Sequence, residues 1–235
     1  EVAYGSAWNT YANNPDSNNF AERDAFDKVA AAADKEAKKR KIPIGQPKLG
    51  LNPKVEQAKY IRKLAGEFRK VMPDVHKEMS KIAYESNSTP KIAPPKANSD
   101  EGKERVMSKA RTAYDNDVSR LTDMERLALI FGNFNDMQTA LQKIMSAYTL
   151  IRIKNRFAKA NANAKETAAY RDCQLLLEVR GTKLQFEVQL HIDVIHALKD
   201  EVATKLGPDG RTGHDRYIEF RNLKEAAVAE YGNDK

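Results

Sequence analysis

The feature that most constrains the fold is a change in the spacing of apolar residues along the chain. Before residue 86, apolar side chains recur every three or four residues, as on one face of a helix. After residue 126, several short stretches are continuously apolar or alternate apolar with polar residues, as in strands. Helices followed by a mixture of helices and strands predict an α+β or α/β domain behind a helical N-terminal region.

The N-terminal region contains three segments of helical character. Residues 21–40 are rich in Ala, Glu and Lys, and basic residues fill the last turns, where they suit the helix dipole. Residues 55–68 place their apolar side chains on one face, and Pro73 is expected to begin a further helix. Residues 1–19 are rich in Asn, Ser and Asp toward their end and are expected to form a loop.

The best candidate for a domain boundary is the segment SNSTPKIAPPKANSD, residues 86–100. Its proline, serine and asparagine content is typical of a loop or linker. We therefore divide the chain into a mainly helical region at 1–100 and a second domain at 101–235.

The second domain is expected to alternate strands with helices. The expected strands are 127–131, 149–157, 173–180 and 183–191. The expected helices are 101–113, 136–147, 192–206 and 214–231. Gly181 lies between the last two strands and predicts a hairpin turn, whereas a polar insert at 158–169 separates the middle two.

Composition narrows the classes of partner and site. The chain has 235 residues and a net charge of +7, which favours phosphate-bearing partners such as nucleotides or nucleic acid. The single cysteine, Cys173, excludes an internal disulfide and a multi-cysteine metal site, and four scattered histidines argue against a histidine-rich zinc site. No run of about 18 apolar residues is present, so we expect no transmembrane helix.

Two acidic residues are candidates for a magnesium site. Asp123 precedes an expected strand, and Glu187 lies inside another, between Phe186 and Val188. Mg²⁺ prefers carboxylate oxygens that leave coordination positions for phosphate and water. Two adjacent strands would bring these residues together although they are 64 positions apart. A helix or strand cap for Asp123 and an ordinary polar strand face for Glu187 are the alternatives.

Basic residues that could bind phosphates lie on both sides of Asp123. One expected helix carries Lys103, Arg105 and Lys109, and Arg105 and Lys109 are neighbours on one helix face because they are four residues apart. Further candidates are Arg126, Lys154 and Arg156. Guanidinium groups suit phosphate binding and stacking because they are planar and permanently charged. A solvated charged surface is the alternative for the whole set.

The order of three motifs resembles the synthetase domain of RelA/SpoT-like proteins, within the nucleotidyltransferase superfamily. The motifs are LTDMERLALIF, YRDCQLLLEV and FEVQLH, and the resemblance covers roughly residues 101–222. It implies an α+β fold in which helices flank a mixed sheet. It also implies that Asp123 and Glu187 bind Mg²⁺ and that nearby basic residues bind ATP.

The same resemblance assigns residues to the acceptor side of the site. Tyr170 matches the tyrosine that stacks on the acceptor base, and His191 and His214 would line the acceptor pocket. The chain departs from the family pattern at Ala169, where glycine is usual, and at Asn155, where aspartate is common. Asp172 stands where many synthetases carry serine, and no histidine–aspartate hydrolase motif is present.

These observations favour a magnesium-dependent transferase of the pyrophosphokinase type, which would move diphosphate from ATP to a nucleotide or RNA hydroxyl. The departures motivate an alternative of another class, a catalytically silent relative that binds nucleotide or RNA. Use as a toxin or effector is compatible with the first hypothesis. A cytoplasmic site of action is expected, with secretion or delivery as the route for an effector; the sequence does not fix the oligomeric state.

Overall fold

The protein has an α+β fold with one five-stranded mixed sheet, which confirms the expected fold class. The computed structural model describes residues 2–12, 14, 18–158 and 171–204, together with 210, 219 and 223. The helices are α1 (Val2–Ala12), α2 (Asn19–Lys39), α3 (Gln57–Glu85), α4 (Asp100–Ala113), α5 (Phe134–Ala147) and α7 (Asp193–Thr204). The 3₁₀ helices are η1 (Lys96–Asn98) and η2 (Val118–Arg120).

The strands are β1 (Thr89–Ile92), β2 (Arg126–Phe131), β3 (Thr149–Asn155), β4 (Cys173–Glu178) and β5 (Gln185–Ile192). Their order across the sheet is β1-β2-β5-β4-β3, with β2 and β5 parallel and the other neighbours antiparallel. The predicted hairpin between β4 and β5 is present, and Gly181 adopts the positive φ of 72° that its turn requires. The adjacency of β2 and β5 brings Arg126 opposite Glu187.

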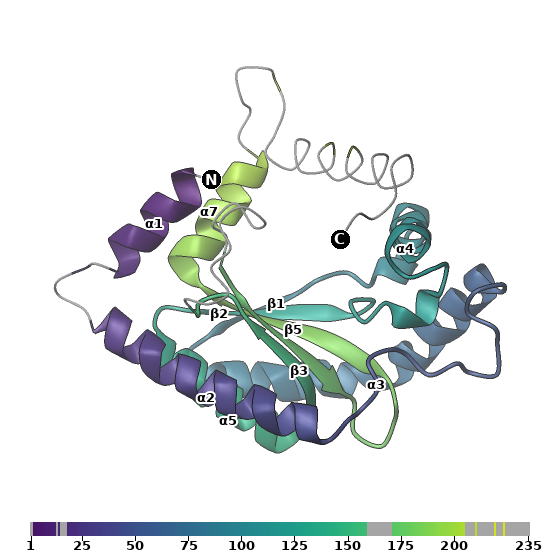
Figure 1. Ribbon diagram of the computed structural model, residues 1–235, viewed down its shortest axis with the longest axis horizontal. Helices are drawn as coiled ribbons and strands as arrows, with labels where there is room; N and C mark the ends of the chain where they lie inside the picture. Colours follow the sequence, from purple (N-terminus) through teal and green to yellow (C-terminus); the bar gives the residue numbers. More distant parts are fainter. Residues whose placement is uncertain are drawn as a thin grey trace.

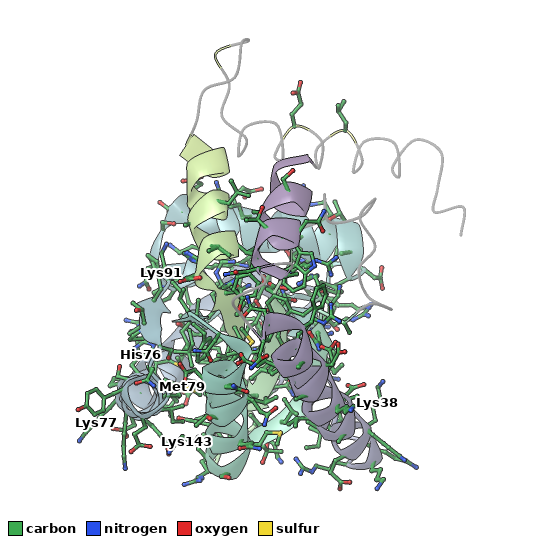
Figure 2. All side chains as sticks on the ribbon, turned by 90° about the vertical axis from the view of Figure 1, so that its left-hand side faces the viewer. Lys38, His76, Lys77, Met79, Lys91 and Lys143 are labelled. Carbon is green, nitrogen blue, oxygen red and sulfur yellow. The ribbon has the colours of Figure 1, made fainter. Side chains whose placement is uncertain are left out.

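The two faces of the sheet differ in what covers them. Helices α2, α5 and α3 lie side by side against one face, and α4 lies on the other side (Figure 1). In the perpendicular view, Lys143 on α5 lies between His76 on α3 and Lys38 on α2 (Figure 2). The helix-covered face is apolar, whereas Glu187 and Gln189 alternate with buried Val188 and Leu190 onto the opposite face.

One hydrophobic core joins residues from both sides of the expected boundary at residue 100. Phe26 of α2 and Phe68 of α3 belong to the same buried cluster as Leu129 of β2 and Phe186 of β5. Burying such side chains contributes about 1.5–3 kcal/mol each, so the helices contribute substantially to stabilising the sheet. The division at residue 100 stays a prediction.

Three segments differ from the expectation. Residues 1–19 are not all loop, because α1 packs its Trp8 against Phe157 and Phe134. Pro73 lies inside α3 and does not begin a new helix; buried apolar residues on either side of it continue one helix face, which offsets the cost of an interior proline. The expected linker contains β1, whose backbone pairs with β2. The expected final helix at 214–231 lies outside the described residues apart from 219 and 223.

Candidate active site

Asp123 is the centre of a cluster of charge at the start of β2. Its carboxylate oxygen Oδ2 accepts hydrogen bonds from the ammonium groups of Lys96 and Lys109, the second at 3.2 Å. Only 16% of the Asp123 side chain is exposed. Its other oxygen, Oδ1, is buried and has no hydrogen-bond partner among the described residues. Lysines therefore satisfy one oxygen of the carboxylate, whereas no described residue satisfies the other.

The two lysines keep Asp123 ionised in spite of its burial. Burial alone would raise the pKa of Asp123, but the charges and hydrogen bonds of Lys96 and Lys109 lower it to about 2. Burial lowers the pKa of Lys96, and the Asp123 carboxylate partly offsets this effect. The pair is thus a compensated buried charge, which is stable only while both partners remain in place.

Local packing explains why Lys96 reaches Asp123. The Lys96 N–H donates to the Met124 carbonyl at 3.3 Å, which fixes η1 against the segment before β2. On the other side, Gly102 lies in the first turn of α4, and its N–H donates to Oγ of the N-cap residue Ser99 at 3.0 Å. A Cβ atom at position 102 would lie 2.0 Å from the Lys96 carbonyl oxygen. Glycine therefore permits the close approach of η1 and α4 that brings both lysines to one carboxylate oxygen.

Glu187 lies on β5, next to the segment that carries Asp123. Its backbone N–H donates to the Glu125 carbonyl at 3.0 Å, and its Oε1 accepts a hydrogen bond from Gln189 at 2.7 Å. Burial raises the pKa of Glu187, the negative charge of Asp123 raises it further, and Arg126 acts in the opposite direction. The two carboxylates therefore act on each other electrostatically.

Asp123 and Glu187 line one cavity of about 530 Å³. Its walls are also formed by Asp34 and Lys38 of α2, Lys109 of α4, Arg152 and Lys154 of β3 and Gln174 of β4. The cavity thus combines three carboxylates, those of Asp34, Asp123 and Glu187, with cations from α2, α4 and β3. This arrangement can bind a polyphosphate beside a pair of acidic groups.

The carboxylates fit a magnesium ion by their chemistry. Among the described residues, no cluster of three or more histidine, cysteine or acidic side chains forms a complete protein cage. Mg²⁺ does not need one, because it is commonly held by one or two carboxylates together with water and substrate phosphates. The unpartnered Asp123 Oδ1 and the coupled Glu187 carboxylate match that pattern.

Several predicted phosphate-binding residues do not line the cavity. The Lys103 ammonium pairs with Asp100 at 2.8 Å, and the Arg105 guanidinium pairs with Glu101 at 2.6 Å. Both ion pairs lie on the exposed surface of α4. Arg126, on β2, is exposed and lies opposite Glu187 of β5. Its positive charge lowers the pKa of Glu187. Of the predicted basic residues, Lys109 and Lys154 line the cavity.

Arg156 has an internal partner at the far end of β3. Its guanidinium donates to Asp172, which is only 1% exposed, and its backbone N–H donates to the Asp172 carbonyl at 2.8 Å. The neighbouring departure from the family pattern, Asn155, has a structural role as well. Its side-chain amide donates to Asp27 of α2 at 2.6 Å, a contact that an aspartate could not make in the same way.

Of the predicted acceptor-side residues, the structure describes only His191, which does not line the cavity. His191 is fully buried, and its ring lies 5.0 Å from that of His196 on α7. Tyr170 and His214 lie outside the described residues. Their proposed contacts with the acceptor stay predictions.

Sequence reasoning did not identify Lys96, Arg152, Asp34 or Lys38 as site residues. Arg152 and Lys154 alternate along β3 and therefore share a face, a signal that the sequence contains. Lys96 lies in the segment that we interpreted as a linker. Asp34 and Lys38 lie on α2, in the N-terminal region to which the sequence assigned no role. The packing of α2 brings Asp34 and Lys38 to the cavity, and the packing of η1 brings Lys96 to Asp123; no local sequence signal predicts either.

No protein-family model matches the sequence, and no curated protein matches it. Among solved structures, the complex of the Type VI effector Tas1 with its immunity protein contains a similar chain, 20% identical, with a TM-score of 0.47. The match covers 74% of this chain and 93% of that chain.

The structure is also similar to the small alarmone synthetase 1 from Bacillus subtilis bound to its product pppGpp, at 12% identity and a TM-score of 0.45. This match covers 75% of this chain and 99% of that chain. A second structure of the same synthetase matches at 14% identity and a TM-score of 0.45, over 73% and 91% of the two chains. Across the described part of the chain, no helix has the length and apolar character needed to cross a membrane.

Proposed function

We propose that this protein is a magnesium-dependent transferase of the pyrophosphokinase type, which moves diphosphate from ATP to a nucleotide or RNA hydroxyl. The observation that supports the proposal is the pairing of Asp123 and Glu187. These carboxylates are 64 residues apart in sequence, yet they line one cavity with several cations. The ordered motifs that resemble RelA/SpoT-like synthetases give the same two residues to the metal.

The proposed reaction is a displacement at the β-phosphorus of ATP. The acceptor hydroxyl oxygen forms a bond to that phosphorus, and the bond to the oxygen bridging the α- and β-phosphates breaks, so AMP leaves. Glu187 on β5 would accept the hydroxyl proton, a role that suits a partly buried carboxylate whose pKa is raised. Mg²⁺ held by Asp123 and Glu187 would supply positive charge to the phosphates.

The cations of the chain have the task of positioning. Lys109 and Lys96 lie at Asp123, where they would hold the triphosphate in line with the acceptor hydroxyl. Lys154 and Arg152 line the same cavity from β3 and would bind phosphates of a second ligand. Phosphoryl transfer depends mostly on such positioning and electrostatic stabilisation, so each lysine is expected to affect the rate.

The test is Glu187→Gln, which keeps size and hydrogen bonding but removes the charge. We expect transfer to fall by at least about a hundredfold, while ATP affinity falls only modestly. The matched control is Glu178→Gln on the neighbouring strand β4, because Glu178 lies outside the residues lining the cavity and pairs with Lys183 at 3.5 Å. Labelled ATP, Mg²⁺ and a panel of guanine and adenine nucleotides and RNA should be used. Robust transfer by Glu187→Gln would remove Glu187 from the mechanism.

One observation favours the alternative of a catalytically silent nucleotide- or RNA-binding protein. Lys96 and Lys109 already neutralise Asp123, so phosphates could bind at these ammonium groups without a metal. A silent binder would give no product with any acceptor and would bind ATP equally well in EDTA. Use as a toxin or effector belongs to the first proposal, and comparing growth during expression of the wild type and of Glu187→Gln tests it.

A further inference from the structure

Gln46, in the connection between α2 and α3, is a buried polar residue whose hydrogen bonds all reach distant backbone. It is only 5% exposed. Its backbone N–H donates to the Ser119 carbonyl at 2.6 Å. Its side-chain amide donates to the carbonyls of Leu121 at 3.3 Å and Gln185 at 2.6 Å, and its Oε1 accepts from the Gln185 N–H at 3.0 Å. One side chain thus bridges two separate segments of the chain.

These two segments carry the candidate catalytic carboxylates. Leu121 precedes Asp123 by two residues, and Gln185 precedes Glu187 by two residues. At about 3.3 Å per extended residue, each tie lies about 7 Å upstream of its carboxylate. Regular pairing of β2 with β5 begins at Arg126 and Glu187. Upstream of that point, the Gln46 amide joins the two backbones.

Gln185 completes the connection in the opposite direction. Its side-chain amide donates to the Pro43 carbonyl at 2.8 Å, and its Oε1 accepts from the Gly45 N–H at 2.9 Å. Gly45 has a φ of 144°, and a Cβ there would lie 3.1 Å from the Ser119 carbonyl oxygen. Only glycine adopts this conformation without strain, so the close approach of residues 43–46 to the segment before Asp123 depends on it.

We infer that Gln46 is a positioning residue that fixes Asp123 relative to Glu187 and so sets the geometry of the proposed metal site. The inference rests on the proposed function for its catalytic consequence, and it gives a role to a residue outside 101–222, the range over which the sequence motifs resemble the synthetases. Removing the amide leaves the buried carbonyls of Leu121 and Gln185 without this donor, so both segments must shift to recover hydrogen bonds. Shifts of about 1 Å in a catalytic group can cost about a hundredfold in rate.

The experiment compares Gln46→Met with Gln57→Met. Methionine keeps the length of glutamine and removes its hydrogen bonds. Gln57 is a matched control because its exposed side-chain amide also donates to a distant backbone carbonyl, that of Asn116 at 2.7 Å, but not in either carboxylate segment. The readouts are Mg²⁺-dependent ATP binding by calorimetry, kcat and KM for transfer, and amide hydrogen exchange at Glu187. We expect Gln46→Met to weaken Mg²⁺ affinity and lower kcat by about tenfold to a hundredfold.

Hydrogen exchange separates this inference from the proposed function. The Glu187 N–H donates to the Glu125 carbonyl, so its exchange reports the alignment of β5 with the Asp123 segment. We expect exchange at Glu187 to accelerate at least about tenfold in Gln46→Met and to stay unchanged in Gln57→Met. If the wild type neither binds Mg²⁺·ATP nor transfers diphosphate, the proposed function fails, and the exchange data still decide the positioning role.

A double-mutant cycle tests whether Gln46 acts through the carboxylates. In a Glu187→Gln background, Gln46→Met should change Mg²⁺ affinity less than it does in the wild type, because one of the two positioned ligands is already lost. If Gln46→Met does not fold, Gln46→Asn keeps the amide, shortens its reach and serves in the same comparison. Equal losses of stability in Gln46→Met and Gln57→Met, with unchanged exchange at Glu187 and unchanged Mg²⁺ affinity, would overturn the inference.

Discussion

Two aspartates at opposite ends of the sheet contrast in how their oxygens are used. Asp123, before β2, has Oδ2 held by Lys96 and Lys109 and Oδ1 without a partner among the described residues. Asp172, before β4, has Oδ1 held by Arg156 and Oδ2 by the Gln174 side chain at 3.1 Å. The Asp172 carboxylate is satisfied at both oxygens, whereas Asp123 has one buried oxygen that no described residue satisfies.

Exposure follows the same contrast. The Asp172 side chain is almost fully buried, and Asp123 borders the cavity. A buried pair that satisfies itself contributes to structural integrity, and its loss destabilises the fold. A charged cluster that borders a cavity and leaves one carboxylate oxygen unsatisfied is instead a candidate binding site. The sequence around Asp123 and Asp172 does not distinguish a binding carboxylate from a structural one. The hydrogen-bond partners of each carboxylate do.

The largest expected effect is on stability, when the buried ion pair of Arg156 with Asp172 is broken. Arg156→Met keeps much of the volume and removes the partner of Asp172, which is left as an uncompensated buried charge. We expect the free energy of unfolding to fall by about 3–5 kcal/mol in urea denaturation. Arg152→Met, an exposed position on the same strand, is the control and should change it by less than about 1 kcal/mol. Equal small effects would mean that the Asp172 pair is not structural.

A second prediction concerns Asn155, which donates to Asp27. Burial raises the pKa of Asp27 and the Asn155 hydrogen bond lowers it. Asn155→Asp would place two carboxylates together and raise the pKa of both above their unfolded values. The folded state then binds more protons, so stability falls as pH rises. We expect a loss of about 2 kcal/mol at pH 7.5 that disappears near pH 3.5.

The double exchange Asp27→Asn with Asn155→Asp is the control for that experiment. It restores one amide and one carboxylate at the contact and should recover most of the stability at pH 7.5. A loss in Asn155→Asp that does not depend on pH would contradict the electrostatic explanation and indicate a steric one.

Local pattern predicted the elements that lie in the sheet better than the connections between them. Alternation and apolar runs located β2, β3, β4 and β5, because a strand with one polar face carries its own signal. β1 was missed because its residues are all exposed and include Pro90, so no alternation marks it. Pro73 was misread because burial of the α3 face, a tertiary effect, outweighs the local preference of proline.

Sequence patterns pointed to two of the three carboxylates that line the cavity and to only some of its cations. Asp123 and Glu187 follow from motif order and from the pairing of adjacent strands. Among the cations, the helix pattern identified Lys109 but did not distinguish it from Arg105, whose side chain pairs with Glu101. Lys96 reaches Asp123 across 27 residues because η1 packs against Gly102, and no local pattern contains that information.

A third prediction concerns Gly102, whose missing side chain lets Lys96 reach Asp123. Gly102→Ala would push Lys96 away from Asp123, because the added Cβ meets the Lys96 carbonyl oxygen. We expect about 1–3 kcal/mol of destabilisation and a several-fold loss of ATP affinity, measured by denaturation and calorimetry. Gly66→Ala in α3 is the control, since nothing lies within 4 Å of its added Cβ and alanine favours the helix by about 1 kcal/mol. A Gly102→Ala protein with wild-type stability and affinity would contradict the close packing of η1 and α4.

The smallest expected effect separates two neighbours on α4. Lys109→Glu places a carboxylate beside Asp123, so ATP affinity should fall by tenfold or more, about 1.4 kcal/mol. Arg105→Glu only replaces an exposed ion pair with Glu101 by a weak repulsion, which changes stability by less than about 0.5 kcal/mol. Because Arg105 does not line the cavity, ATP affinity should change less than twofold, about 0.4 kcal/mol. If Arg105→Glu weakened ATP binding as much as Lys109→Glu does, Arg105 would have to leave Glu101 for the nucleotide, and the sequence-based assignment of Arg105 to the nucleotide site would be correct.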